Sequence, residues 1–196
     1  REREDADERN HGEAQRVAAW MGDDNLAGGG GVDTFKANDG ATTITDFGVG
    51  GTDKVVIKNG STLAATVTQH YSAGVKTDID NLAADNTKAV FTVADGINFS
   101  AALATDTAKG LTITATGNNL ASTLEGTDQD DIITGGKGAD TLKGGVGNDN
   151  LTGGTGAHMF QGNAGTTTVT DFAVGDEVDK AVIDAGATLN AAVKGD

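Results

Sequence analysis

Aspartate side chains recur at a fixed spacing between Gly126 and Gln161. This stretch consists of four nonapeptides, which read GTDQDDIIT, GGKGADTLK, GGVGNDNLT and GGTGAHMFQ. Their sixth residues are Asp131, Asp140, Asp149 and His158. Carboxylate and backbone carbonyl oxygens are the hard ligands that Ca²⁺ takes in proteins. The spacing therefore predicts a series of calcium-binding turns, with one turn in every nine residues.

Each nonapeptide divides into a turn and a short strand. The first six residues, GGxGxD, need glycines because several turn positions take φ > 0 or bring backbone against backbone. The last three residues form a strand with a large apolar residue at its centre, namely Ile133, Leu142, Leu151 and Phe160. One such strand cannot hold itself together, so the copies must stack on each other, which predicts an all-β solenoid. A flexible glycine-rich linker is the alternative, but linkers show no nine-residue apolar period.

The pattern resembles the nonapeptide GGxGxDxUx of the RTX (repeats-in-toxin) family, in which U is apolar. The second and third copies match at every defined position, whereas the first departs at Thr127 and Gln129 and the fourth at His158. The resemblance implies a parallel β-roll in which two nonapeptides form one coil and calcium lies between stacked turns on each side. It implies these metal-binding residues in the roll: Gly126, Asp128, Asp131, Gly135, Gly136, Gly138, Asp140, Gly144, Gly145, Gly147, Asp149, Gly153, Gly154 and Gly156.

The resemblance also implies which turns share a side of the roll. Turns 18 residues apart stack, so Asp131 and Asp149 belong to one calcium row and Asp140 and His158 to the other. Histidine is a poor ligand for calcium. His158 therefore marks the end of the second row.

Residues 19–36 carry an earlier copy of the motif. AWMGDDNLA and GGGGVDTFK place Asp24 and Asp33 at the sixth position. Asp33 is a candidate calcium ligand, and its turn contains Gly28, Gly29 and Gly31. Asp24 is either a ligand or a side chain that only stabilises its turn.

The segment that starts at Gly28 is similar to the segment that starts at Gly153. Each continues into a T-I/V-T-D-F strand, a glycine turn and a D-K-x-V-I strand, and we expect this strand pair to close the roll. The ending resembles that of RTX repeats in secreted proteases and surface-layer proteins, where the aspartates beside the last coil can supply calcium. Asp46 and Asp171 match those positions, and a purely structural role in the turn is the alternative for both.

The sequence predicts five segments. These are a charged N-terminal segment with helical propensity (1–18), a first short β-roll with closing strands (19–57), a connector of short strands and helices (58–116), the second β-roll (117–161), and closing strands with a tail (162–196). We expect Trp20, the single tryptophan, to cover the open end of the first roll.

The composition excludes several classes of partner. The net charge of −15 disfavours nucleic acids and anionic membranes. With no cysteine, disulfides play no part, and metal or packing must supply the stability. No stretch approaches 18 apolar residues, so we expect no membrane insertion. We also find no N-terminal signal peptide, and the resemblance implies type I secretion, which reads a C-terminal signal.

Catalytic motifs are missing from the sequence. The three histidines are far apart, and neither HExxH, GxSxG nor GxxxxGK[ST] occurs. We expect no enzyme, but a calcium-dependent structural segment of a secreted or surface-layer (S-layer) protein that folds and assembles outside the cell. One alternative is a C-terminal export and folding module of a larger type I-secreted protease or lipase. Another is an adhesin or ice-binding repeat, for which these rolls look too short and irregular.

Overall fold

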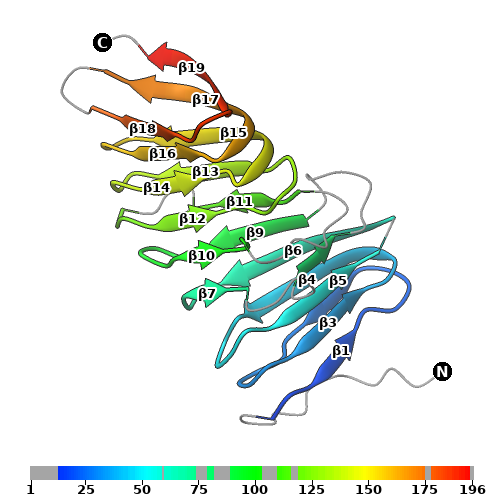
Figure 1. Cartoon of the computed structure of the whole chain (residues 1–196). Coiled ribbons are helices and arrows are strands. Elements are labelled where there is room, and N and C mark those ends of the chain that lie inside the picture. The colour runs from blue at the N-terminus through cyan, green and yellow to red at the C-terminus, as the bar shows by residue number, and fades with distance from the viewer. Residues whose placement is uncertain are drawn as a thin grey trace.

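The computed structural model describes residues 13–58, 60–73, 79–81, 89–102, 110–115, 119–174 and 178–194. Within these ranges the chain contains β-strands and no helix, and the strands coil into a parallel β-solenoid of about eight turns (Figure 1). The expected all-β parallel β-roll is therefore confirmed. Within the same ranges, no helix has the length and apolarity needed to cross a membrane.

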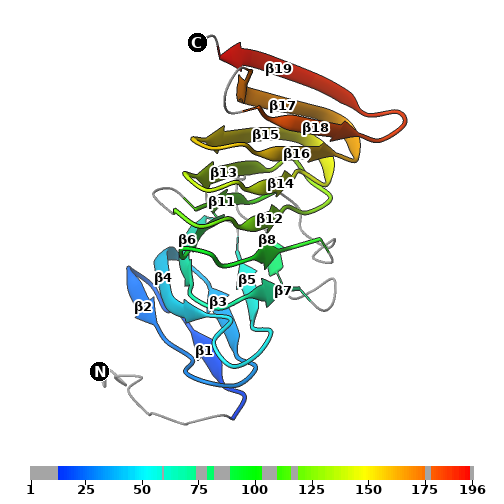
Figure 2. The same ribbon diagram turned by 90° about the vertical axis from the view of Figure 1, so that its left-hand side faces the viewer.

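One side of the solenoid is a continuous nine-stranded sheet, here called the long sheet. Neighbouring strands pair in parallel from one end of the molecule to the other (Figure 2). In spatial order they are β2 (Asp24–Leu26), β4 (Gly40–Phe47), β6 (Ser61–Val67), β9 (Ala89–Val93), β11 (Thr112–Thr114), β13 (Ile132–Gly136), β15 (Val146–Gly154), β17 (Ala164–Ala173) and β19 (Thr188–Lys194).

The opposite side, here called the split side, consists of two sheets. The first contains β1 (Arg16–Ala18), β3 (Thr34–Ala37), β5 (Lys54–Ile57) and β8 (Ile79–Asn81). The second contains β7 (Tyr71–Ser72), β10 (Phe99–Ser100), β12 (Thr123–Glu125), β14 (Thr141–Lys143), β16 (Met159–Gly162) and β18 (Lys180–Ile183). The side is therefore interrupted between β8 and β7.

The nine-residue period sets the register of the second roll. Ile133 lies beside Leu151 in the long sheet, and Leu142 lies beside Phe160 on the split side. All four side chains are fully buried. Because two nonapeptides form one coil, strands on the same side are 18 residues apart, and their central residues form two columns that face each other across the core.

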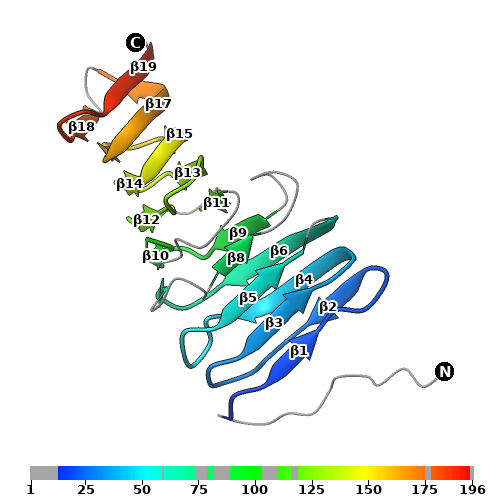
Figure 3. The same ribbon diagram turned by 45° about the vertical axis from the view of Figure 1, so that its right-hand side comes forward.

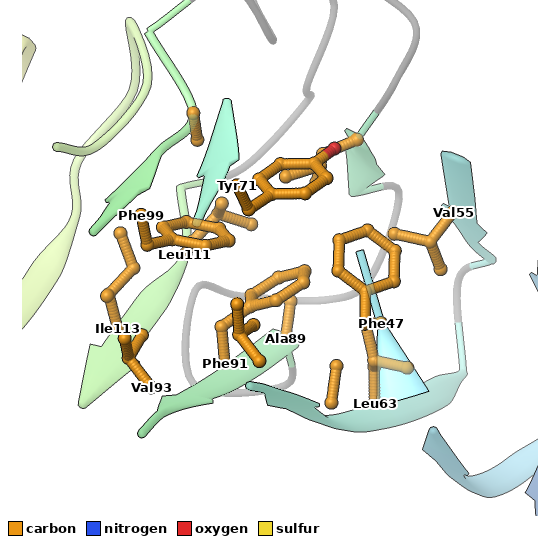
Figure 4. Packing of buried hydrophobic residues seen from close by; sticks show 14 of the residues in the cluster. Phe47, Val55, Leu63, Tyr71, Ala89, Phe91, Val93, Phe99, Leu111 and Ile113 are labelled. Carbon is orange, nitrogen blue, oxygen red and sulfur yellow. The ribbon is translucent and has the colours of Figure 1, made fainter. Parts of the chain in front are cut away.

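Aromatic side chains fill the core where the split side is interrupted. Phe47, Tyr71, Phe91 and Phe99 come from different strands and pack on one another, with ring centroids 4.9–5.4 Å apart between neighbours (Figure 4). Aromatic pairs at such distances stabilise a core beyond their buried area. The described strands of the connector thus belong to the same stack as the strands of the two rolls.

The two expected closing strand pairs have different positions in the fold. β4 pairs with both β2 and β6, and β5 pairs with both β3 and β8, so the first pair is internal. Of the second pair, β17 and β18, β18 lies at the edge of its sheet, whereas β17 pairs with both β15 and β19 (Figure 3). The reason is that further strands continue the stack, namely β6 and β8 after the first pair and β19 after the second.

The N-terminal expectations need two corrections. Residues 16–18 form the strand β1, which pairs with β3, and not part of a helix; residues 1–12 lie outside the described ranges. Trp20 is 80 % exposed and covers no core. Val17, in the preceding strand β1, instead supplies the buried apolar residue of the first coil.

Candidate metal centre

The sixth residue of each repeat precedes the central core residue of a strand by two positions. Through the strand registers, these residues form two rows along the edges of the solenoid. Row A, which leads into the long sheet, contains Asp24, Thr42, Leu63, Ala89, Leu111, Asp131, Asp149, Thr167 and Leu189. Row B, which leads into the split side, has two parts that no strand register connects: the first contains Gln15, Asp33 and Asp53, and the second contains Gln69, Ile97, Ser122, Asp140, His158 and Asp179.

The rows bring together the carboxylates that the repeats predict. Asp131 and Asp149 are neighbours in row A, and Asp140 and His158 are neighbours in row B, as the 18-residue spacing requires. Asp33, Asp131, Asp140 and Asp149 are at most 2 % exposed. A buried charge is costly unless it is paired, hydrogen-bonded or bound to a metal, so the partners of each carboxylate decide what the rows can do.

In every row aspartate except Asp24, one carboxylate oxygen binds the preceding coil. The backbone N–H of Asp131 donates to Oδ1 of Asp149 at 3.0 Å, and that of Ser122 donates to Oδ1 of Asp140 at 2.8 Å. The same bond joins Gln15 to Asp33 at 2.9 Å. Each aspartate thereby holds its own coil to the preceding one, in addition to the hydrogen bonds between the strands.

The other carboxylate oxygen turns back toward the start of its own turn. The N–H of Thr127 donates to Oδ2 of Asp131 at 2.6 Å, and the N–H of Gly136 donates to Oδ2 of Asp140 at 3.0 Å. Asp24 accepts the N–H of Trp20 at 2.9 Å in the same way. These bonds explain why the turn is compact and why the short side chain of aspartate suits it.

The first glycine of the repeat makes room for this carboxylate. A Cβ atom on Gly126 would overlap Oδ2 of Asp131, and one on Gly144 would overlap Oδ2 of Asp149. The glycine is therefore required at these positions by the space that the aspartate of the same repeat occupies.

Among the described residues, two buried carboxylate oxygens have no hydrogen-bond partner. They are Oδ2 of Asp33 and Oδ2 of Asp149. The N–H groups of Gly28 and Gly29, which open the turn of Asp33, donate instead to another carboxylate. An unpartnered buried anionic oxygen is a position where a cation would bind favourably.

Burial raises the pKa of several row carboxyls. The pKa of Asp149 rises to about 6 because burial disfavours its charged form, and the neighbouring Asp130 adds to the rise. Burial raises the pKa of Asp131 to about 7 and that of Asp53 to about 6. The pKa of Asp33 is raised by burial and by the Asp46 carboxylate. The charged forms of these carboxyls are thus less stable in the calcium-free folded protein than in water.

Two aspartates of row B lie outside the nine-residue repeats. Asp53 and Asp179 occupy row B and bind as the others do: Asp53 Oδ1 accepts the N–H of Asp33 at 2.8 Å, and Asp179 Oδ1 accepts the N–H of His158 at 2.7 Å. The signal that could have found them is an aspartate two residues before the apolar residue in GGTDKVV and DEVDKAV. Extra residues in these turns break the nine-residue period.

The stacked positions of row B continue past His158 to Asp179, whereas the end of the calcium row at His158 stays a prediction. The Nδ1 of His158 accepts the N–H of Asp140 at 3.2 Å, which is the bond that an aspartate oxygen accepts elsewhere. Its own N–H donates to Asp179. Its Nε2 is buried without a hydrogen-bond partner among the described residues. Histidine therefore replaces aspartate in the stacking of coils while supplying no hard oxygen ligand.

Asp46 and Asp171 have the same role in the two similar segments. Asp171 accepts the N–H groups of Gly153 and Gly154, both at 2.8 Å, one on each carboxylate oxygen. Asp46 accepts those of Gly28 and Gly29 at 3.1 and 2.8 Å. Both carboxylates thus clamp the paired glycines of the coil that precedes them, which favours the structural alternative for these two residues.

The glycines later in each turn lie against the carbonyls of the neighbouring coil. A Cβ atom on Gly145 would overlap the carbonyl oxygen of Thr127, and one on Gly147 would come within 2.6 Å of that of Gln129. Gly154 and Gly156 approach Gly136 and Gly138 in the same way. The turns of one row therefore stack with their carbonyl oxygens close to the next turn.

Comparison with known families decides the nature of these turns. Residues 21–44 and 116–158 match the family model described as RTX calcium-binding nonapeptide repeat (4 copies). This protein carries RTX calcium-binding repeats. No curated protein and no solved structure matched the chain.

RTX nonapeptide repeats bind calcium, and the residues of this chain fit that ion. Among the described residues, no three His, Asp or Glu side chains are grouped so that they could hold a metal by themselves. The available donors are instead one carboxylate per turn and the carbonyls of stacked turns, which are all hard oxygens. The Oδ2 atoms of Asp33 and Asp149 are the buried carboxylate oxygens in the described ranges that have no hydrogen-bond partner, and they are therefore candidate donors.

The RTX rows are not continuous along the molecule. In row A the positions between the two rolls are Leu63, Ala89 and Leu111, which are apolar and buried. Asp24 and Asp149 are each followed in row A by a threonine, Thr42 and Thr167, whose buried hydroxyl has no hydrogen-bond partner in the described part of the chain. The residues with calcium-binding chemistry thus form one group in each roll.

Proposed function

We propose that the chain is a calcium-dependent structural segment of a secreted or surface-layer protein, which folds and assembles outside the cell. The observation that carries the proposal is the pair of rows of buried aspartates, with an unpartnered Oδ2 on Asp33 and on Asp149. Proteins with RTX repeats are typically secreted to the extracellular medium. The proposal assigns no catalytic role to the chain.

The physical basis is the coupling of folding to cation binding. In the calcium-free chain, folding moves carboxylates such as Asp131 and Asp149 out of water, although the net charge is already −15. Calcium, when bound, supplies positive charge that balances these carboxylates. An ion that binds only the folded state stabilises it by mass action, by about 2.7 kcal/mol at 100 times its dissociation constant. Low free calcium therefore favours the unfolded chain, and high free calcium favours the solenoid.

Far-ultraviolet circular dichroism, recorded as free calcium is raised from excess EGTA, tests the proposal. We expect the two rolls to be disordered in EGTA, which leaves a weak β-sheet signal, and this signal to rise cooperatively as calcium is added. Magnesium at the same concentrations is the control, because it demands a smaller and more regular octahedral site. A β-sheet spectrum that is unchanged in excess EGTA contradicts the proposal.

A threonine column on the long sheet favours a second candidate, an adhesin or ice-binding function. Six consecutive strands place threonine in one outward-facing register, namely Thr66, Thr92, Thr114, Thr134, Thr152 and Thr170. The hydroxyls of Thr152 and Thr170 are 2.7 Å apart. The sequence suggests rolls that are too short and irregular for ice binding, but the stack that carries this column is longer and more regular.

Inhibition of ice recrystallisation by the calcium-loaded chain tests this second function. Thr134→Lys would interrupt the threonine column, whereas Thr123→Lys places the same charge on the split side. The ice-binding function requires inhibition by the unmodified chain that Thr134→Lys abolishes and Thr123→Lys retains. Absence of inhibition by the unmodified chain rules it out.

A further inference from the structure

The last coil exposes apolar side chains that its internal counterpart buries. The similar segments place Val193 and Ala191 of β19 at the positions of Val67 and Ala65 of β6. Val193 is 62 % exposed and Val67 is fully buried. The two coils have the same pattern of residues, so the difference lies in what covers them.

A further coil covers the internal copy. β5 pairs with β8 and β6 pairs with β9, whereas β18 and β19 are edge strands (Figure 3). An edge strand offers unpaired N–H and C=O groups to another strand. At the opposite end of the solenoid, Val17 and Leu26 remain at most 8 % exposed. The exposed core residues are therefore concentrated at the C-terminal coil.

Two charged residues lie symmetrically about Val182 of β18, one at the start of the strand and one just after its end. Lys180 and Asp184 lie two residues before and two residues after Val182, in the sequence KAVID. If β18 pairs in antiparallel orientation with β18 of a second copy, centred on Val182, each Lys180 lies opposite an Asp184. Opposite charges that face each other across two strands stabilise the pair, and like charges destabilise it.

The strand β19 has the same self-complementary character. Antiparallel pairing centred on Ala191 places Leu189 opposite Val193 of the second copy, and Thr188 opposite Lys194. Ala191 and Ala181 occupy the core positions of the same coil. The centres of the two pairings therefore differ by about one residue along the strands, or roughly 3.3 Å, so one two-fold axis can serve both.

We propose that β18 and β19 form a two-fold interface that binds the same coil of a second copy, so that two solenoids join at their C-terminal ends. Such an interface uses one surface on both copies and closes as a dimer. It covers Val182 and Val193, which are 48 % and 62 % exposed in the single chain. The interface rests on the proposed function, because the coil must first fold with calcium.

Charge exchange between Lys180 and Asp184 tests the interface by sedimentation equilibrium at saturating calcium. We expect the unmodified chain to be a dimer, and Lys180→Asp or Asp184→Lys to weaken dimerisation at least about tenfold, because each places like charges opposite each other. Mixing the two variants should restore a heterodimer, because the two acidic side chains of one variant then face the two lysines of the other.

Val193→Lys places a lysine in the proposed interface, and Val146→Lys is the control that places one at another exposed valine. Val146 is also about half exposed, at 49 %, but lies in the middle of the second roll. We expect Val193→Lys to give monomers and Val146→Lys to leave the dimer intact, with the same calcium-loaded circular dichroism in both.

A calcium-folded chain that stays monomeric overturns the interface but leaves the proposed function standing. An open-ended series of oligomers also overturns it, because a two-fold interface closes at two copies. Failure to fold with calcium overturns both.

Discussion

At the scale of single residues, the carboxylates of the repeat have two separable roles. One oxygen joins adjacent coils through backbone N–H groups, as Asp149 does with Asp131. The other oxygen either closes its own turn, as in Asp140, or lacks a partner within the described ranges, as in Asp149 and Asp33. Removing the charge and removing the hydrogen bonds should therefore have different consequences.

Asp149→Asn tests the role of the charge. Asparagine keeps a carbonyl oxygen that can accept the N–H of Asp131 but loses the negative charge. We expect the calcium concentration at the folding midpoint to rise about tenfold, which corresponds to roughly 1.4 kcal/mol. Calcium titration followed by circular dichroism measures the midpoint. Asp39→Asn, at an exposed turn, is the control, and an equal shift in both variants would argue against Asp149 as a ligand.

The raised pKa values predict how pH affects the calcium-free chain. Burial raises the pKa of Asp131 to about 7 and those of Asp53 and Asp149 to about 6, from 3.8. Between those values the folded state binds more protons than the unfolded state, so its stability falls as pH rises from about 4 to about 7. In calcium-depleted buffer, we expect a stronger β-sheet signal in circular dichroism at pH 5 than at pH 7.5.

Asp131→Asn is the control for this pH dependence. It removes the carboxyl with the highest of these pKa values while keeping an acceptor oxygen. The loss of β-sheet signal between pH 5 and pH 7.5 should become smaller in this variant. A calcium-free chain with a stronger β-sheet signal at pH 7.5 than at pH 5 would contradict the assigned direction.

At the scale of the element, each turn is built around its own aspartate. Gly144 has no left-handed backbone angle, yet a Cβ there would overlap the carboxylate of Asp149. Gly186 has a φ of +94°, but open space surrounds its Cα. Substituting alanine at Gly144 therefore tests steric overlap alone, and at Gly186 backbone strain alone.

Gly144→Ala should destabilise the calcium-loaded protein more than Gly186→Ala. Overpacking costs about 1–3 kcal/mol, and here it also displaces a candidate ligand. The left-handed conformation costs roughly 1–2 kcal/mol in alanine. Urea unfolding at saturating calcium measures both free energies, and Gly144→Ala should also weaken calcium binding. A larger effect of Gly186→Ala on both quantities would mean that overlap with Asp149 is unimportant.

The nine-residue period predicts the second roll well, because each position of the nonapeptide has one fixed structural role there. It gives the strands, the buried residues such as Leu142 and Leu151, and the 18-residue pairing of Asp131 with Asp149. It fails where the turns change length. Asp53 and Asp179 follow longer turns, so their place in row B depends on stacking that a local period does not reveal.

At the scale of the whole molecule, two rolls share one continuous long sheet. The coils between them carry apolar residues in row A and an aromatic cluster around Phe47 and Phe99, so hydrophobic burial can hold them without a metal (Figure 4). The sequence predicts a connector that packs beside the second roll. It does not predict that the connector strands continue the stack, because the spacing of these strands is irregular. Stability should accordingly depend on calcium most strongly in the two rolls.

Hydrogen exchange with and without calcium tests this account most directly. The account predicts that, with calcium, backbone amides of residues 126–161 and 28–57 exchange at least about 100-fold more slowly than in EGTA, which corresponds to roughly 2.7 kcal/mol of calcium-linked stability. Equal protection of these segments with calcium and in EGTA would contradict it.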